Sequence, residues 1–333
     1  MKNFLLLLCL SLAVLPAYPQ DDVEVVVVTG KRPGPPLWKV TNGENTLWIL
    51  PLVLVVPKNM EWDDARVAAL IAQAQEVIST PNVSYGVSKG VLLNPVNAFR
   101  AMRMWKHIQK NPDDATLVEV LPATVYARYS ALKLAYFPRD RDIDQLRPSV
   151  ASQVMFTHVM DAEELITPAG IVQRVQKHIR NNKDIVVTET RLEHTLQGKF
   201  SELRTRAESL MNGLDPEQEA ACFDLRLGVL EHQVDDIKAV ANAWANGSST
   251  GFADFLDEGN IDNPCASLML KSSEGELLGQ LELESRQLWL DAAQKALEKN
   301  RTTFAMLPLA QIMGDASFVD ELGARGFAVR EPQ

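Results

Sequence analysis

Apolar side chains recur along the chain in patterns that predict an alternation of strands and helices. A nearly continuous apolar run over residues 46–56 is typical of a strand that is buried on both faces. Pro51 lies inside this run and cannot donate a ladder hydrogen bond, so we expect a strand over about residues 46–50 and then a turn or bulge. A helix is predicted to follow from Trp62, because apolar residues recur there at helical spacing.

The other predicted strands come mainly from the two ends of the chain. Asn42-Gly43 predicts the turn of a β-hairpin that leads into the first apolar run. Near the C-terminus, strands are predicted over 302–307 and 327–330, with a helix over 316–322. Between the ends we expect one short strand over 184–189 and otherwise helices, over residues 96–108, 117–137, 147–160, 167–179, 200–211, 215–244, 251–257 and 277–297.

This order of elements predicts an α/β fold of α+β-like character. A small central sheet would form from the two chain ends, with a large helical insertion at about 94–299. The folded domain would cover residues 37–333.

The first residues have the features of a secretory signal peptide. Lys2 precedes an apolar stretch over residues 4–15, and cleavage is expected between Ala17 and Gln20. A transmembrane anchor is the alternative, but this stretch is shorter than the ~20 apolar residues of a membrane-spanning helix. We therefore predict a signal peptide over 1–20, a Pro/Gly-containing linker over 21–36, and a periplasmic or secreted protein with no transmembrane span after cleavage.

Charge and cysteine content narrow the choice of partner and compartment. The formal net charge of −10 argues against a nucleic-acid partner, which requires a basic surface. Cys9 lies in the signal segment, so Cys222 and Cys265 remain in the exported chain. An even number of cysteines in an exported protein predicts a disulfide between them, with two unpaired buried thiols as the alternative.

Two segments resemble the TraB/GumN family, also called the Tiki-like superfamily. The segment LWILPLVLVVPKNMEW resembles the family pattern LW-Φ-Φ-G-x-x-H-x-x-P-K-x-Φ-x-W, in which Φ is apolar, but Pro51 stands at the Gly position and Leu54 at the His position. A second Gly-x-x-His is expected near the C-terminus, where FAMLPLAQIMGD places Pro308 and Gln311. Thr80 stands where the family often has an acidic residue.

In the family, the paired motifs and the acid imply a metal or acid–base site. Leucine can neither bind a metal nor titrate, and glutamine does not titrate. We therefore predict that no catalytic, cofactor-binding or metal-binding residue remains at Pro51, Leu54, Thr80, Pro308 and Gln311. The predicted function is a non-catalytic, pseudoenzyme-like exported protein that binds a protein or small molecule in the cell envelope. The alternative is a periplasmic metal-dependent hydrolase or peptidase that uses other residues.

Other candidate residues carry weaker signals. Five histidines remain, each expected in a helix or at its flank: His107, His158, His178, His194 and His232. His232, Asp235 and Asp236 would share a helix face, where they would form either a metal site or a solvated surface. Arg286 lies close to a position where the family often has an arginine, although a helix-face salt bridge also accounts for it.

Overall fold

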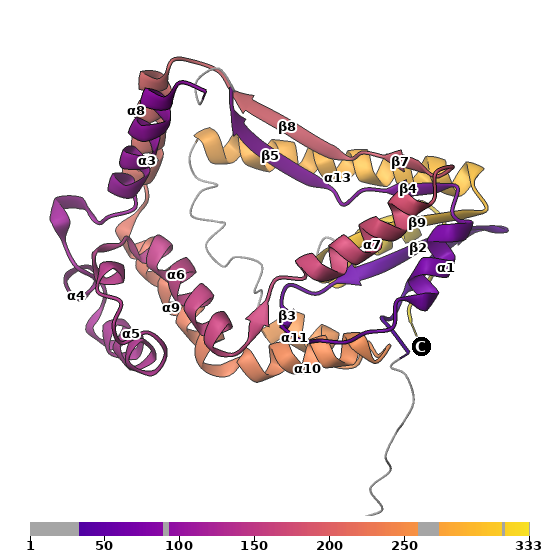
Figure 1. Ribbon diagram of the computed structural model, residues 1–333, viewed down its shortest axis with the longest axis horizontal. Helices are drawn as coiled ribbons and strands as arrows, with labels where there is room; N and C mark the ends of the chain where they lie inside the picture. Colours follow the sequence, from indigo (N-terminus) through magenta and orange to yellow (C-terminus); the bar gives the residue numbers. More distant parts are fainter. Residues whose placement is uncertain (1–32, 89–92, 259–272, 315–316, 333) are drawn as a thin grey trace, which may run out of the picture. The chain divides into compact units, whose positions relative to one another are not determined.

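The fold centres on a mixed sheet built largely from the two ends of the chain. The computed structural model describes residues 33–88, 93–258, 273–314 and 317–332 (Figure 1). Within these residues, six strands pair in the order β10-β1-β2-β9-β4-β7. They are β1 (Trp38–Asn42), β2 (Asn45–Leu52), β4 (Glu76–Ile78), β7 (Val186–Thr188), β9 (Thr302–Pro308) and β10 (Ala328–Arg330). The predicted α/β class and the sheet from the chain ends are confirmed.

Strand directions differ between the two halves of this sheet. β1 and β2 form the predicted antiparallel hairpin, with Asn42 opposite Asn45 and Gly43 at φ 58° in the turn. β10 is antiparallel to β1, whereas β2, β9, β4 and β7 run parallel to one another. The carboxyl ends of these parallel strands therefore meet at one edge of the sheet.

β2 is longer than the sequence predicted, because it continues through Pro51 to Leu52. The partner strand β1 ends opposite Ile49, so β2 has no strand neighbour on that side at Pro51. On a strand, the N–H and C=O of one residue point to the same side. Trp244, which is not part of the sheet, donates to the Pro51 carbonyl. The N–H that proline lacks would point to this same side, where no strand could accept it, so no ladder hydrogen bond is lost. β2 continues through Pro51, and the predicted turn or bulge is wrong.

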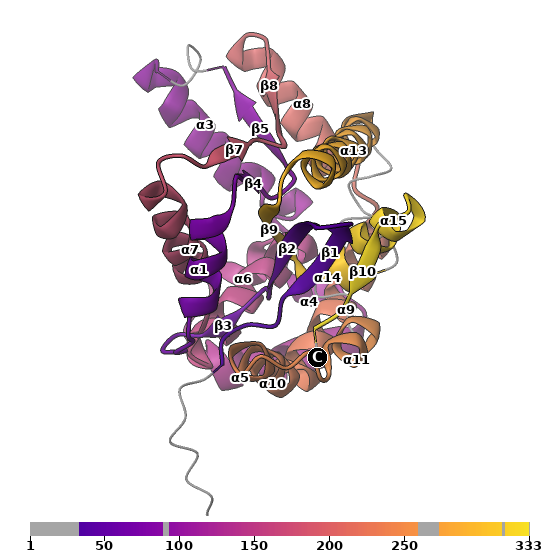
Figure 2. The same cartoon turned by 90° about the vertical axis from the view of Figure 1, so that its right-hand side faces the viewer.

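Helices cover the sheet (Figure 2). α1 (Ala65–Gln73) packs on β9 and on α7 (Ala169–Asn181), and α13 (Ser273–Lys299) packs on β1, β2 and β4. α14 (Leu309–Met313) and α15 (Phe318–Ala324) follow β9. α1 begins three residues later than predicted, and the Asp63 carboxylate just before it accepts a 2.9 Å hydrogen bond from the Ala65 amide.

The helical segment between the ends has a second hydrophobic cluster of its own. It lies between α4, α5, α6 and α9, and Tyr129 and Phe223 are fully buried in it. Arg147 and Glu219 form a buried ion pair of 2.9 Å beside it. The elements are η1 (Pro112–Asp114), α4 (Leu117–Val120), α5 (Ala123–Tyr136), η2 (Asp142–Gln145), α6 (Pro148–Ala162), α9 (Pro216–His232), α10 (Val234–Ala245) and α11 (Phe252–Glu258).

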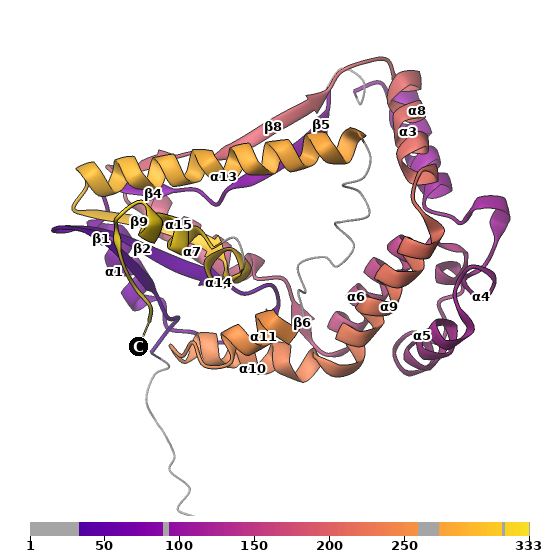
Figure 3. The same ribbon diagram turned by 180° about the vertical axis from the view of Figure 1, so that it is seen from behind.

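Two small strand pairs lie outside the main sheet. β3 (Val56–Pro57) pairs with β6 (Leu165–Ile166), and β5 (Asn82–Val87) pairs in parallel with β8 (Arg191–Leu196). None of these four strands is predicted from the sequence. Beyond the β5–β8 pair lie α3 (Pro95–Ile108) and α8 (Phe200–Asn212), which pack on each other (Figure 3).

Only the end of the predicted linker lies within the described residues. Gly34, Pro35 and Pro36 are buried, so this end of the predicted linker packs on the domain. The predicted signal peptide over 1–20 lies outside the described residues. None of the described helices has the length and apolar character that crossing a membrane requires.

Candidate functional site

The two segments that carry the degenerate motifs lie side by side at the carboxyl edge of the sheet. β2 and β9 are parallel neighbours, with Pro51 opposite Leu307 and Leu52 opposite Pro308. The two proline positions are therefore one residue out of register on adjacent strands. α14, which begins after Pro308, also packs on β2. The structure thus brings together two segments that are more than 200 residues apart in the sequence.

The third predicted position, Thr80, also reaches this edge. It follows β4, which pairs in parallel with β9 on the side away from β2. The Thr80 hydroxyl donates a 3.2 Å hydrogen bond to the carbonyl oxygen of Met306. Thr80 is therefore bonded to the end of β9, two residues before Pro308.

The side chains at the two histidine positions differ in environment. Leu54 is 43% exposed, which is a large value for a leucine next to the core residues Val53 and Val55. Gln311 is half-buried, and its Oε1 atom is fully buried with no hydrogen-bond partner in the described part of the chain. The two histidine positions therefore hold an exposed apolar side chain, Leu54, and a buried amide oxygen of Gln311 that accepts no hydrogen bond within the described residues.

Arg286 lies close to the segment that follows the second motif. Its Nη2 donates a 3.1 Å hydrogen bond to the carbonyl oxygen of Ser317, and its guanidinium lies 4.3 Å from the centroid of the Phe318 ring. These contacts hold α13 against the start of α15. Arg286 thus contacts a carbonyl group and an aromatic ring at the start of α15, and the predicted salt bridge stays a prediction.

A pocket of about 520 Å³ lies beside β3, the short strand that follows the first motif. Its walls come from the loop after β3, from the end of α6 with β6, and from α10; the lining residues are Pro57, Lys58, Asn59, Met60, Glu61, Glu163, Glu164, Leu165, Lys238 and Asn242. The Lys58 amide donates a 2.7 Å hydrogen bond to the Glu164 carbonyl, which joins two of these walls.

Glu163 makes two side-chain hydrogen bonds in the wall of the pocket. It accepts hydrogen bonds from Lys238 Nζ at 2.6 Å and from the Tyr136 hydroxyl at 3.1 Å. The bond from Lys238 lowers the pKa of Glu163, and the same bond raises the pKa of Lys238. Burial, together with the carboxylate, raises the pKa of Tyr136. Both side chains of the ion pair therefore stay charged across the neutral range.

A family model describes nearly the whole chain. The model of the TraB/PrgY/gumN family matches residues 36–331. The chain belongs to the TraB/PrgY/gumN family. Comparisons with curated proteins and with solved structures find no significant match.

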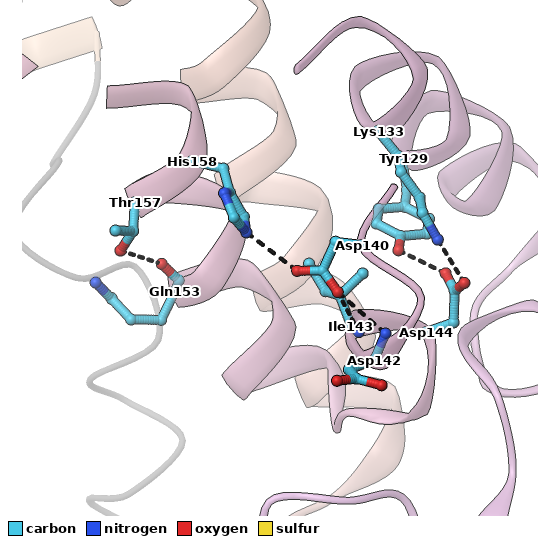
Figure 4. A network of polar contacts seen from close by, with 9 residues as sticks. All are labelled: Tyr129, Lys133, Asp140, Asp142, Ile143, Asp144, Gln153, Thr157 and His158. Carbon is cyan, nitrogen blue, oxygen red and sulfur yellow. Dashed lines mark hydrogen bonds and ion pairs between the residues drawn. The ribbon is translucent and has the colours of Figure 1, made fainter. Parts of the chain in front are cut away.

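The histidines of this TraB/PrgY/gumN member lie away from the two motif loops in the sequence. His158 contacts Asp140 at 3.1 Å (Figure 4), and it also stacks on Phe137. His178 contacts Asp64 at 2.9 Å. His107 lies in α3, and His194 lies on β8, where a helix flank was predicted. His158 and His178 each pair with a single carboxylate, which is the ordinary arrangement of a structural histidine.

His232, Asp235 and Asp236 do not lie on one continuous helix, and all three are exposed, as the solvated-surface alternative predicts. The helix breaks at Gln233, so His232 ends α9 and the two aspartates lie in the first turn of α10. Two separate helices have no common face, and the His232 side chain is 79% exposed. Across the described residues, no group of three or more His, Cys, Asp or Glu side chains is placed to hold a metal ion.

Cys222 is 3% exposed and packs beside Leu214 and Met211. Its predicted partner, Cys265, lies outside the described residues, so the disulfide stays a prediction. The pocket beside β3 is not predicted from the sequence. The Pro57-Lys58 pair of the family pattern was one signal for it, because these two residues form part of its wall.

Proposed function

We propose that this member of the TraB/PrgY/gumN family is a non-catalytic, exported protein that binds a ligand or partner in the cell envelope. The observation that carries the proposal is the pairing of β2 with β9, which places the two degenerate motifs at one sheet edge. At these positions the sequence has Leu54 and Gln311 in place of the two imidazoles of the family pattern.

The chemistry of these residues supports the loss of catalysis. A leucine side chain offers no lone pair, and a glutamine amide neither titrates near neutral pH nor is a common zinc ligand. Proline at both glycine positions also removes the backbone N–H that glycine would offer to a ligand. Four changes at one edge all act against metal or acid–base chemistry.

The pocket beside β3 supports a binding role. Its volume of about 520 Å³ lies within the range of ~300–1,000 Å³ that is common for small-molecule sites. Lys58 and Lys238 offer donors, whereas Glu61, Glu163 and Glu164 offer acceptors. A polar molecule with both donor and acceptor groups is the ligand class that matches this lining.

Export is supported by the signal-like segment over residues 1–20 and by the two cysteines that remain after it. In an oxidising compartment we propose that Cys222 and Cys265 form a disulfide, which would stabilise the fold by about 2–4 kcal/mol. Peptide mapping by mass spectrometry without reductant tests this pairing. Recovery of two alkylated, unlinked cysteine peptides from the exported protein would contradict it.

Metal analysis of the purified protein tests the loss of catalysis. We expect zinc and manganese well below one equivalent per chain, and no hydrolytic turnover that depends on a residue of the sheet edge. One equivalent of either metal, or turnover that disappears when an edge residue is replaced, would establish the periplasmic metal-dependent hydrolase instead.

A pair of substitutions on α10 tests the binding role. Asn242 lines the pocket, and Asn246, at the end of the same helix, does not. Asn242→Trp would fill the pocket with an indole ring, whereas Asn246→Trp is the matched control. In a thermal-shift screen of small polar metabolites, we expect ligands that stabilise the wild type and the control but not Asn242→Trp. Equal shifts for all three proteins would place binding elsewhere.

A further inference from the structure

α3 exposes an unusual number of large apolar side chains to solvent. Phe99, Met102 and Trp105 are 61%, 53% and 57% exposed, Val96 is 55% exposed, and Leu93, just before the helix, is 80% exposed. Single exposed apolar residues are ordinary, but five within one short segment are typical of a binding surface.

The packing of α3 leaves this surface free in the described structure. The less exposed residues of the helix recur at helical spacing and lie on one face; they are Asn97, Ala101, Met104 and Ile108. α8 is the helix that packs on α3 (Figure 3). The opposite face contains Phe99, Met102, Arg103 and Lys106, which are spaced i, i+3, i+4 and i+7 and are all exposed.

The charge of this segment is opposite to that of the protein. Residues 93–110 contain Arg100, Arg103, Lys106 and Lys110 and no aspartate or glutamate. The whole chain has a formal net charge of −10. A basic, apolar helix face on an acidic protein selects an anionic and apolar partner.

We propose that the exposed face of α3 docks on a membrane surface that carries anionic lipids. An interfacial helix buries aromatic and aliphatic side chains at the headgroup boundary and keeps its basic groups among the headgroups. Phe99 and Met102 would enter the boundary, while Arg103 and Lys106 would extend along their methylene stems to the lipid phosphates. Trp105, at the border of this face, is the residue type that is enriched at membrane interfaces.

Charge argues against a second copy of the chain as the occupant. A two-fold interface built on this face would bring each basic residue close to its own symmetry mate or to another basic residue. Residues 93–110 contain no aspartate or glutamate, so this segment offers no carboxylate to pair with the basic side chains. Such an interface would therefore place like charges against each other. The anionic lipid surface satisfies both the apolar and the basic side chains.

Hydrogen exchange of the full chain, followed by mass spectrometry, tests the proposal. Because the apolar stretch over residues 4–15 could itself bind lipid, the readout is the local protection of peptides from residues 93–110. We expect protection with vesicles of phosphatidylcholine containing phosphatidylglycerol, and none with phosphatidylcholine alone. Each basic residue adds about 1 kcal/mol near an anionic surface, so Arg103→Gln/Lys106→Gln should require roughly 30-fold more vesicles for half protection.

Two further variants keep the test independent of folding. Phe99→Ser/Trp105→Ser should abolish protection, whereas Leu134→Ser, at a 75% exposed leucine of α5, should not change it. Circular dichroism should show unchanged melting for all of these surface variants. Equal protection by neutral vesicles, unchanged protection in Arg103→Gln/Lys106→Gln, or protection that rises with protein concentration alone would each overturn the proposal; the last would indicate self-association.

Discussion

The indole nitrogen of Trp244 donates a hydrogen bond of 2.7 Å to the carbonyl oxygen of Pro51. This contact joins α10, in the middle of the chain, to the first degenerate motif on β2. Trp244 is fully buried and packs against the ring of Trp62 with a centroid distance of 5.2 Å. The backbone at the glycine position of the motif is thus held by the helical segment as well as by the sheet.

Trp244→Phe should lower the free energy of unfolding by about 1–3 kcal/mol more than a tryptophan-to-phenylalanine change that breaks no hydrogen bond, because the buried Pro51 carbonyl loses its donor. Trp289→Phe is the matched control, because Trp289 is also fully buried but its Nε1 has no hydrogen-bond partner among the described residues. Urea unfolding of both variants measures the difference. Equal losses of unfolding free energy would show that the hydrogen bond contributes nothing.

The Glu163–Lys238 pair should make stability depend on pH at both ends of the scale. The folded-state pKa of Glu163 is lowered by Lys238, so its contribution is present above about pH 4.3 and is lost as the pH falls through the folded pKa. The pKa of Lys238 is raised, so its contribution is present below about pH 10.4 and is lost as the pH rises through the folded pKa.

Between these limits the pair should contribute about 0.2–1 kcal/mol, because both side chains remain partly exposed. A double-mutant cycle of Glu163→Gln and Lys238→Met, unfolded in urea at pH 7 and at pH 3, measures this coupling. We expect the coupling to be larger at pH 7 than at pH 3, because protonation of Glu163 removes the charge that pairs with Lys238. A cycle on Arg204 and Glu208, an exposed pair on one helix, is the control. Identical coupling at both pH values would contradict the assignment.

Gly34 should tolerate no side chain, although it lies at the end of the predicted linker. Its φ is +82°, and a Cβ atom would lie 2.2 Å from the carbonyl oxygen of Asp63. Gly43 also has a positive φ, but a Cβ there would meet no atom within 4 Å. We therefore expect Gly43→Ala to cost about 1–2 kcal/mol and Gly34→Ala to cost more. Thermal melts of the two variants test the order, which would be reversed if residues 34–36 were not packed.

Much of the fold could be predicted from the sequence because, in the core, the spacing of apolar residues matches the faces that are buried. The β1–β2 hairpin, β9 and α7 have buried faces that match their apolar positions. β8 could not be predicted, although RLEHTL alternates between exposed and half-buried residues. Its half-buried face consists of two leucines and a histidine, which is too little apolar character to indicate a strand. In α3 the apolar spacing predicted the helix correctly, but Phe99 faces solvent.

The candidate site could be located only in part. The resemblance placed Pro51 and Pro308 in comparable loops, but only the β2–β9 pairing makes them neighbours. Nothing local in the sequence indicates that Trp244 binds Pro51, or that the end of α6 and α10 complete a pocket with Lys58. Such contacts depend on how distant elements pack, which local periodicity does not encode.

A zinc titration of a variant with the family residues restored is the decisive test of the two degenerate motifs. If the two strand ends retain the outline of a two-histidine site, then Pro51→Gly, Leu54→His, Pro308→Gly and Gln311→His together should create it. Calorimetry should show about one zinc bound per chain at neutral pH, with no binding to the wild type or to a Leu225→His control on α9. A folded four-substitution variant that binds no more zinc than the wild type would contradict the account.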